Sequence, residues 1–417
     1  MNIKKKNKLK LWQRVVLAMI LGVVFGSLFK DIKIYGFEFS SKDLEPIGIV
    51  FLNMIKMIVM PLIFLSILNG VTNVNDADTF SRLGVRALLM YVCTTIFAVT
   101  IGIFFATVFE PGLNTNIKLE NLSCSNIHEN KSLKEIFINM IPSNPIKAMS
   151  EENILQVVIF SFFTGFALIS VGDKGREVKN FVSSANHLIF KMIQIIIRFT
   201  PYGVFATMSW VVSEYGFNVM LHLGKFISVV LGGLIVQYLL FGFMILFIAK
   251  LSPLPFFIKM LNSQSLALAT SSSKATLATA IKDMRKKIGV SKESASFILP
   301  LGAAINMDAT AIYLGICSVF FAQIFGMTLS YNDYIVLIFT STIGSIGAAG
   351  FPGGAVIMMS VVLSSINVPL EGMAIILGVD KILEMVRTMI NITGDCTITL
   401  IVDKMEGRFN KKIYYTK

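Results

Sequence analysis

The segment Met373–Val402 reads MAIILGVDKILEMVRTMINITGDCTITLIV, an apolar stretch that is interrupted by charge. Five polar residues recur along it at steps of three and four: Glu384, Arg387, Thr388, Asn391 and Asp395. This spacing places them on one face of a helix. An ionisable side chain at membrane depth costs about 2.5–3.5 kcal/mol on insertion scales. We therefore expect this face to line a polar site, with both signs of charge, inside a membrane protein.

The composition of the chain is that of a membrane protein. Of its 417 residues, 54% are hydrophobic and only 15% are charged, far fewer charges than a soluble domain carries. Ile227–Ala249 and Ala309–Asn332 contain no charged residue. Each is long enough to cross a hydrocarbon core of about 30 Å as a helix. We expect a polytopic protein built of membrane helices.

The formal charge of +12 comes from basic clusters at the ends of apolar segments, at residues 4–10, 82–86, 282–287 and 404–412. Such clusters mark the cytoplasmic ends of membrane helices. We expect a multi-pass protein of the cell (inner) membrane with both termini cytoplasmic, and no nucleic-acid partner. The N-terminus resembles a signal peptide, but no small-residue cleavage site follows. We therefore expect an uncleaved first membrane helix.

Hydropathy and helix breakers predict six helices in the first part of the chain. They cover residues 11–30, 45–70, 84–110, 152–172, 183–212 and 219–249. The longest polar stretch, Pro111–Lys134, lies between the third and the fourth. Three crossings from a cytoplasmic N-terminus place this loop outside.

Two later segments are predicted to enter the membrane and turn back. Tyr334–Leu370 is uncharged over 37 residues, which as one helix would be about 55 Å long, nearly twice the thickness of the bilayer core. Its middle, GSIGAAGFPGG at 344–354, does not suit a helix, and no polar turn separates two crossings. Irregular backbone at this depth is tolerated only inside protein or at a water-filled cavity. We therefore expect a re-entrant hairpin.

Pro253–Ile281 repeats this pattern around a small polar centre, TSSSKAT at 270–276. Each hairpin is followed by a long helix with an intramembrane acid, Asp308 after the first and the 380–395 face after the second. Two such units indicate an inverted repeat with a binding site at the interface of its halves.

The polar centre of the first hairpin has two other interpretations. By composition it is as readily a flexible polar turn. Ser271 and Lys274 also match the serine–lysine pattern of penicillin-binding enzymes, but neither SDN nor KTG follows. We expect a protein that is not an enzyme.

Asp308 follows Pro300 and Gly302, which are expected to break the helix just before the acid. It is either hydrogen-bonded within a kinked helix or part of a cation site. Hard cations such as sodium prefer several oxygen ligands. Carboxylates and amides that supply such oxygens are Asn306, Asp308, Asn391 and Asp395.

Arg387 carries a forked, permanently charged donor that suits a carboxylate. The alternative is an internal pair with Glu384, three residues earlier. Arg387 can have each of these two partners in a different state of the site. Glu384 would neutralise Arg387 in the empty site and would face an ammonium group when substrate is bound.

Four motifs resemble, in this order, those of the dicarboxylate/amino acid:cation symporters, the family of the glutamate transporters and their prokaryotic homologues. They are TSSSKAT (270–276), NMDAT (306–310), GSIGAAGFPGG (344–354) and RTMINITGD (387–395). The resemblance extends from the first helix to Lys404. It implies an all-α membrane fold of eight transmembrane helices and two re-entrant hairpins, a homotrimer in the lipid bilayer, and elevator-like alternating access.

The resemblance also divides the chain into a scaffold and a transport domain. The scaffold would comprise residues 1–81, with helices 1 and 2, and residues 134–216, with helices 4 and 5. The transport domain would comprise two stretches. They are 82–133, with helix 3 and the external loop, and 217–417, with helix 6, hairpin 253–282, helix 7, hairpin 334–366, helix 8 and the C-terminal tail.

A substrate site follows from the same resemblance. Ser273 and the tip of the second hairpin would hold the α-carboxylate of an acidic amino acid. Arg387 and Thr310 would take its side-chain carboxylate, and Glu384, Thr388 and Asn391 its amino group. The whole implied set is Ser272, Ser273, Met307, Thr310, Gly350, Pro352, Gly353, Glu384, Arg387, Thr388 and Asn391.

Three sodium sites are implied as well, with sodium as the coupling ion and no other cofactor. The first set is Gly302, Asn306, Asn391 and Asp395. The second set is Tyr91, Thr94, Thr95, Asn306 and Asp308. The third set, which would act mostly through backbone carbonyls, is Ala304, Ser345, Ile346 and Ala348.

Two positions resemble particular branches of the family. Arg387 is similar to the acidic-substrate branch, and Asp395 to the sodium-coupled branch. The chain departs from the pattern at Glu384, where aspartate is usual, and at Lys274, where a small residue is usual. We expect sodium-coupled uptake of aspartate or glutamate. The alternatives are a proton-coupled C4-dicarboxylate carrier and, from another class, an ion channel.

Overall fold

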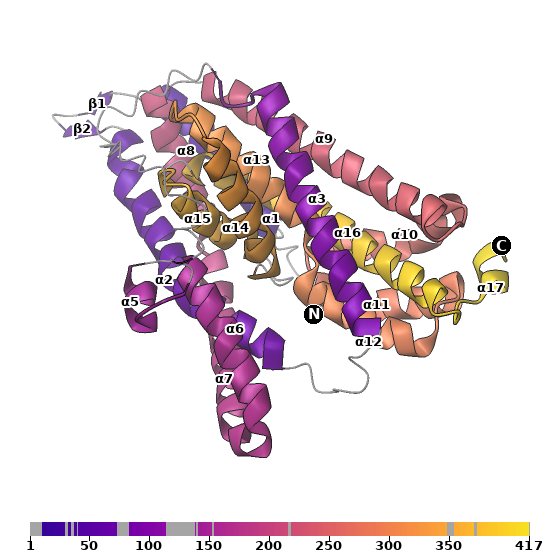
Figure 1. Ribbon diagram of the computed structural model, residues 1–417. Coiled ribbons are helices and arrows are strands. Elements are labelled where there is room, and N and C mark those ends of the chain that lie inside the picture. Colours follow the sequence, from indigo (N-terminus) through magenta and orange to yellow (C-terminus); the bar gives the residue numbers. More distant parts are fainter. Residues whose placement is uncertain are drawn as a thin grey trace, which may run out of the picture.

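The structure, a computed structural model, describes residues 11–29, 32–34, 37–39, 41–72, 83–113, 138, 141–151, 154–215, 218–347, 354–370 and 373–416. Helices make up most of this part of the chain (Figure 1). The first half contains α1 (Leu11–Leu28), α2 (Glu45–Thr72), α3 (Val85–Phe109), α5 (Pro145–Ser150), α6 (Ile154–Val171), α7 (Arg176–Ile197), α8 (Thr200–Tyr215) and α9 (Asn218–Phe247). Two short strands, β1 (Ile32–Ile34) and β2 (Phe37–Phe39), form an antiparallel hairpin between α1 and α2.

The second half is formed by shorter helices and one long one. They are α10 (Pro253–Thr270), α11 (Ser273–Asp283), a turn of π-helix (Met284–Ile288), α12 (Lys292–Ile305), α13 (Asp308–Ile324), α14 (Tyr331–Gly347), α15 (Gly354–Ser365), α16 (Met373–Met405) and α17 (Lys411–Tyr415). Two of the breaks between them, before α11 and before α13, coincide with the small and polar residues that the sequence places at 270–276 and 306–310.

Several helices are long and apolar enough to cross a membrane. Within the described residues four qualify: Val85–Phe109, His222–Phe247, Lys292–Ile324 and Val379–Met405. Thr200–Ser213 continues a helical run that ends at Ile196 after a bend of 51°, and counting this bent pair as one span gives a fifth. A helical chain with several membrane-capable segments is what the composition predicts.

The long helix α16 occupies the centre of the molecule. It packs against α9, α10, α12 and α13 and also touches α11 and α15, and Figure 1 shows it running between α9 and α3. Its residues from Asn391 to Asp403 are all buried, and they include Asp395 and Asp403. The polar face of this helix is therefore covered by protein on several sides.

Two pairs of helices pack together in the segments where the sequence predicts hairpins. In the first, α10 and α11 pack together and are joined by Ser271 and Ser272. Ser271 takes the left-handed conformation with φ 50°, and the Ser272 hydroxyl accepts a hydrogen bond from the Ala275 amide at 3.3 Å. In the second, α14 and α15 pack together. The tip of the second hairpin, 348–353, lies outside the described residues.

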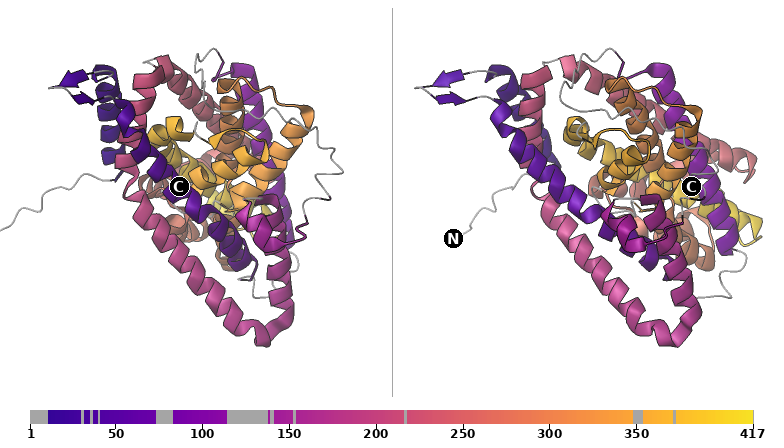
Figure 2. Two further views of the ribbon diagram at one scale, coloured as in Figure 1. Left: turned by 90° about the vertical axis from the view of Figure 1, so that its left-hand side faces the viewer. Right: turned by 60° about the vertical axis from the view of Figure 1, so that its left-hand side comes forward.

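A second group of helices packs beside this assembly. Helix α1 lies along α8, and α2 lies against α6, α7 and α8. Both views of Figure 2 show α6 and α7 as a V whose closed end extends beyond the other helices. Helices α1, α2 and α6–α8 thus pack largely on one another, while α1 and α8 also contact α16 and α2 also contacts α14 and α15.

Two predicted boundaries are wrong in detail. The helix expected over 183–212 is two helices, α7 and α8, because the chain leaves the helix at Arg198 and Phe199 and begins α8 with Pro201 near its start, a position that suits proline. Pro300 does not end its helix but lies inside α12. The break comes later, at Asn306 and Met307, and still immediately precedes Asp308.

Candidate functional site

The break between α12 and α13 is held by a side chain of α16. Asn306 ends α12 in an extended conformation, and α13 begins at Asp308. The first amides of a helix lack intrahelical partners, and the Ala309 amide donates to Asn391 Oδ1 at 2.8 Å. Asn391 Nδ2 lies 3.3 Å from Met307 Sδ and 3.4 Å from Thr310 Oγ1. Asn391 therefore joins the start of α13 to the middle of α16.

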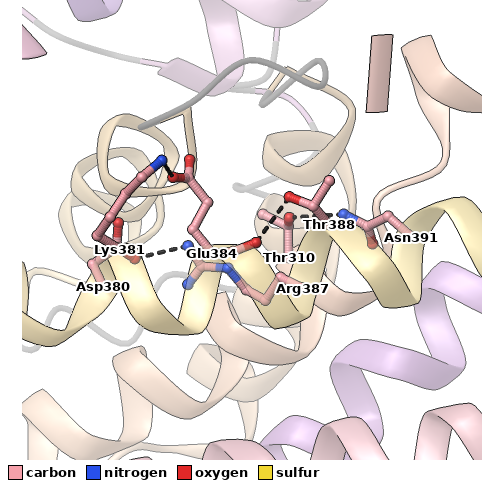
Figure 3. Close-up of polar contacts among 7 residues, drawn as sticks. All are labelled: Thr310, Asp380, Lys381, Glu384, Arg387, Thr388 and Asn391. Carbon is pink, nitrogen blue, oxygen red and sulfur yellow. Dashed lines mark hydrogen bonds and ion pairs between the residues drawn. The ribbon is translucent and has the colours of Figure 1, made fainter. Parts of the chain in front are cut away.

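Arg387 pairs with Asp380 and not with Glu384. Its Nη2 donates to Asp380 Oδ1 at 2.7 Å, and the two side chains are 2% and 7% exposed (Figure 3). The guanidinium also lies 3.8 Å from the ring centroid of Tyr313 on α13, close enough for a cation–π contact. The expected neutralisation of Arg387 by Glu384 is wrong, because an acid two turns earlier on α16 does this instead.

Glu384 has a different cationic partner. Figure 3 shows its carboxylate meeting the ammonium of Lys381, one turn earlier on the same helix. Thr388 extends the row, and its hydroxyl donates to the Glu384 carbonyl at 2.8 Å. The face of α16 that the sequence predicts as polar thus contains two separate ion pairs, each with its own acid.

The Arg387 guanidinium keeps a donor without a partner. Its Nη1 is buried and has no hydrogen-bond partner among the residues that the structure describes. A buried donor left unpaired costs about 1–3 kcal/mol, and more when it is charged. A ligand carboxylate would fill this position with the geometry that a guanidinium favours.

Three residues of the first implied sodium set, Gly302, Asn306 and Asp395, lie together. Asn306 Nδ2 donates to Asp395 Oδ1 at 3.0 Å. A Cβ added at Gly302 would lie 2.5 Å from the Tyr91 hydroxyl and 2.6 Å from Asp395 Oδ1, so these groups meet where only glycine fits. Within the described residues, Asp395 Oδ2 and Asn306 Oδ1 are buried without hydrogen-bond partners. Two buried oxygens that lack donors suit a small cation.

The second implied set is assembled around Asp308. The hydroxyl of Thr95 lies 2.9 Å and that of Thr94 3.3 Å from Asp308 Oδ1. Gln237 on α9 donates to Asp308 Oδ2 at 3.2 Å. Tyr91 is not bonded to this carboxylate, because its hydroxyl donates to the Ile298 carbonyl at 3.1 Å. The structure places Tyr91 beside Gly302 and therefore nearer the first set.

The remaining implied residues lie on the hairpins or outside the described part of the chain. Ser273 is buried in the first turn of α11, and Lys274 beside it is exposed. Ser345 is buried in α14, which packs against the α12 helix that contains Ala304. Ile346 lies in α14. Four implied residues lie outside the described part of the chain: Ala348, Gly350, Pro352 and Gly353.

Four residues of this site do not appear among those predicted from the sequence. They are Gln237, Tyr313, Asp380 and Lys381. Spacing gives a signal for two of them, since Asp380 and Arg387 are separated by two helical turns and Lys381 and Glu384 by one. Gln237 interrupts an otherwise apolar, uncharged run. Tyr313 gives no such signal, because tyrosine is common in apolar helices.

Comparison with known proteins places the whole chain among membrane transporters. The model of the sodium:dicarboxylate symporter family matches residues 11–405. A proton/sodium-glutamate symport protein of Bacillus caldotenax is 31% identical over 411 residues, which are 96% of this chain and 95% of the relative. A C4-dicarboxylate transport protein of Bacillus subtilis (strain 168) is 30% identical over 407 residues, or 95% of this chain and 94% of the relative. A C4-dicarboxylate transport protein of Rhodospirillum rubrum is 31% identical over 420 residues, which are 96% of this chain and 89% of the relative.

Proposed function

The chain belongs to the sodium:dicarboxylate symporter family, and from this premise we propose that it couples the uptake of aspartate or glutamate to sodium. Membership makes the chain a membrane symporter and not an enzyme. The relatives are named for two kinds of substrate, glutamate and C4-dicarboxylates. Both kinds carry two carboxylates, so the proposal depends on how this chain binds a carboxylate and on what it offers an amino group.

The observation that carries the proposal is the environment of the Arg387 guanidinium. Its guanidinium is buried, is held in place by Asp380 and Tyr313, and keeps Nη1 without a partner among the described residues. A substrate carboxylate would complete the donor set of this group. Charge-assisted contacts of this kind, when buried, are worth about 2–5 kcal/mol or more on truncation. Arg387 would therefore select an acidic substrate.

The other substrate contacts are proposed by resemblance and are compatible with the helices around Arg387. Thr310, Thr388 and Asn391 lie on α13 and α16 beside it (Figure 3). The further members are Ser272, Ser273 and Met307, together with Gly350, Pro352 and Gly353 of the second hairpin. Glu384 would receive the substrate ammonium, which distinguishes an amino acid from a simple dicarboxylate.

Sodium is proposed as the coupling ion. Support comes from the buried oxygens of Asp395 and Asn306, which have no hydrogen-bond partner among the described residues, and from the oxygen cluster around Asp308. Asn391, which bridges α13 and α16, would couple these ion sites to the substrate. Ion entry would replace the missing hydrogen-bond donors, so that substrate and sodium would stabilise the same arrangement of the two helices.

We further propose the architecture that the family resemblance implies. It has eight transmembrane helices and two re-entrant hairpins in an inverted repeat, assembled as a homotrimer in the cell (inner) membrane with both termini cytoplasmic. Residues 1–81 and 134–216 would form the scaffold, and 82–133 and 217–417 the moving transport domain. The packing of α1 along α8 and of α2 against α6, α7 and α8 supports this division.

Uptake in proteoliposomes tests the proposal. We expect labelled aspartate or glutamate to accumulate when sodium is high outside, and not when choline replaces sodium at the same pH. Arg387→Cys should abolish binding of both acids while the protein stays folded, as judged by gel filtration. Uptake that is indifferent to sodium would overturn the coupling, and aspartate transport by Arg387→Cys would overturn the substrate assignment.

A proton-coupled carrier of C4-dicarboxylates is the second candidate function. The observation in its favour is the ion pair between Glu384 and Lys381, because it already satisfies the acid that an amino group would need. Competition between succinate and labelled aspartate, with and without sodium, separates the two candidates. A carrier that binds succinate without sodium and ignores aspartate would replace our first proposal.

A further inference from the structure

The partner of Glu384 is an ammonium group that belongs to the protein itself. The Lys381 side chain reaches one helical turn along α16 and pairs with the Glu384 carboxylate. The lysine ammonium and the α-ammonium of an amino acid are the same chemical group, with three N–H donors and one positive charge. Lys381 thus occupies the acid that the proposed function assigns to the amino group of the substrate.

The charges of the ligand-free site balance in two pairs. Arg387 is matched by Asp380 and Lys381 by Glu384. A ligand with carboxylates only can use Arg387 while the Lys381–Glu384 pair stays intact. A ligand with an ammonium group must share the Glu384 carboxylate with Lys381 or displace Lys381, so that two positive charges compete for one acid. The free energy of binding at Glu384 therefore differs between a simple dicarboxylate and an amino acid.

Lys381 is placed so that it can move away. Its side chain is 19% exposed, whereas those of Glu384 and Arg387 are 8% and 2% exposed. A lysine has a long flexible stem, so the Lys381 ammonium can turn away from Glu384 more readily than a fully buried cation could. Arg387 is fixed between Asp380 and Tyr313 and has no comparable route.

We propose that Lys381 is a specificity-determining residue that competes with the substrate ammonium for Glu384. In this role, which rests on the proposed function, Lys381 disfavours aspartate relative to succinate by imposing a displacement that only the amino acid must make. The pair acts as an internal competitor. Removal of the Lys381 ammonium therefore changes the ratio of the affinities for aspartate and succinate. It does not simply raise or lower both affinities together.

The experiment measures aspartate and succinate affinity on the same purified transporter at saturating sodium. Labelled succinate is bound at equilibrium and displaced by unlabelled aspartate. In Lys381→Met the Glu384 carboxylate is left for the ligand, and we expect the aspartate-to-succinate ratio of dissociation constants to fall by about tenfold or more. In Glu384→Gln the acid is lost while Lys381 remains, and we expect this ratio to rise.

Two controls distinguish competition from a general effect of charge or folding. Lys381→Arg keeps the cation and should leave the ratio near that of the wild type. Lys225→Met removes a cation on α9 that binds the Glu110 carbonyl instead, and it should change neither affinity. A ratio that Lys381→Met leaves unchanged or raises overturns the proposal.

The remaining outcomes are equally informative. Loss of both ligands in Lys381→Met, with both retained in Lys381→Arg, would make the pair a structural support and would overturn its role in selection. A wild-type protein that binds neither acid with sodium overturns the proposed function before any variant is made, and this role falls with it. A wild type that binds both acids, with an unaltered ratio in Lys381→Met, overturns the competition alone.

Discussion

The guanidinium of Arg387 lies 2.7 Å from the carboxylate of Asp380, two turns earlier on the same helix. Both side chains are buried, and the pair is therefore shielded from water and salt. One consequence is that the Arg387 guanidinium keeps its position and its counter-ion when no ligand is present. A second is that a ligand carboxylate approaches a guanidinium whose orientation is already set.

Replacement of Asp380 by asparagine should destabilise the ligand-free protein. Loss of one member of a buried pair leaves the other charge uncompensated and costs about 3–5 kcal/mol. A bound dicarboxylate would restore an acid to Arg387, so we expect a larger rise in Tm on adding aspartate than in the wild type. The buried thiols of Cys317 and Cys396 allow the unfolding to be followed with a fluorogenic thiol reagent.

Asp283 provides the matched control for this prediction. It is also buried, and it pairs with Lys287 at 2.9 Å and accepts from Ser263 at 2.8 Å at the base of the first hairpin. Asp283→Asn should lower the Tm and leave the rise caused by aspartate unchanged. A ligand-free Tm of Asp380→Asn equal to that of the wild type would show that Arg387 does not depend on this acid.

The sequence predicts the helices and breaks around this site better than it predicts the ion pairs. Small residues and serine correctly predict the break between α10 and α11, because irregular backbone has few alternatives inside a membrane. Side-chain pairing is different, since Arg387 has acids at Glu384 and Asp380 and both lie within reach along a helix. The choice between them depends on Lys381, which holds Glu384, and on Tyr313, which packs on the guanidinium from another helix.

Replacement of Asp395 by asparagine should weaken the sodium dependence of aspartate binding. The Oδ2 atom of Asp395 is buried without a partner among the described residues, and an amide supplies no negative charge to a cation there. We expect the midpoint of the sodium titration to rise by about tenfold or more, since buried charge contacts exceed 1.4 kcal/mol. The measurement is equilibrium binding of labelled aspartate across a range of sodium at constant ionic strength.

A second buried acid of α16 tests whether this effect is specific. Asp403 lies two turns beyond Asp395, and it accepts from the Ser291 hydroxyl at 2.5 Å and from the Ser291 amide at 3.1 Å at the start of α12. Asp403→Asn should lower the Tm without moving the sodium midpoint. An unchanged sodium titration in Asp395→Asn would remove Asp395 from the ion site.

Substitution of Gly302 by alanine should close the space between Tyr91 and Asp395. The added methyl group would lie within 2.6 Å of both side chains, so one of them must move. We expect weaker sodium binding with little change in the affinity for aspartate at saturating sodium. Gly224→Ala is the matched control, because a methyl group there meets nothing within 4 Å, and it should bind sodium as the wild type does.

The position of Gln237 shows what a single sequence hides. It lies in an apolar stretch of α9 that is distant in the chain from every predicted site residue, and spacing along one helix does not relate it to Asp308. Packing of α9 against α13 and α3 brings the three helices together. Contacts of this kind depend on tertiary structure, whereas the row on α16 depends only on the helical repeat.

Replacement of Gln237 by leucine should leave Asp308 Oδ2 without its donor at 3.2 Å. Loss of a donor to a buried carboxylate oxygen destabilises the folded protein by about 1–3 kcal/mol. A bound sodium ion can take the place of that donor. We expect a lower Tm without sodium and a larger stabilisation when sodium is added. Gln264→Leu removes a buried amide that binds Tyr238 and Thr393 instead, and it should lower the Tm without changing the response to sodium. Equal sodium responses in the two variants would separate Gln237 from the ion site and leave it a structural contact of α9.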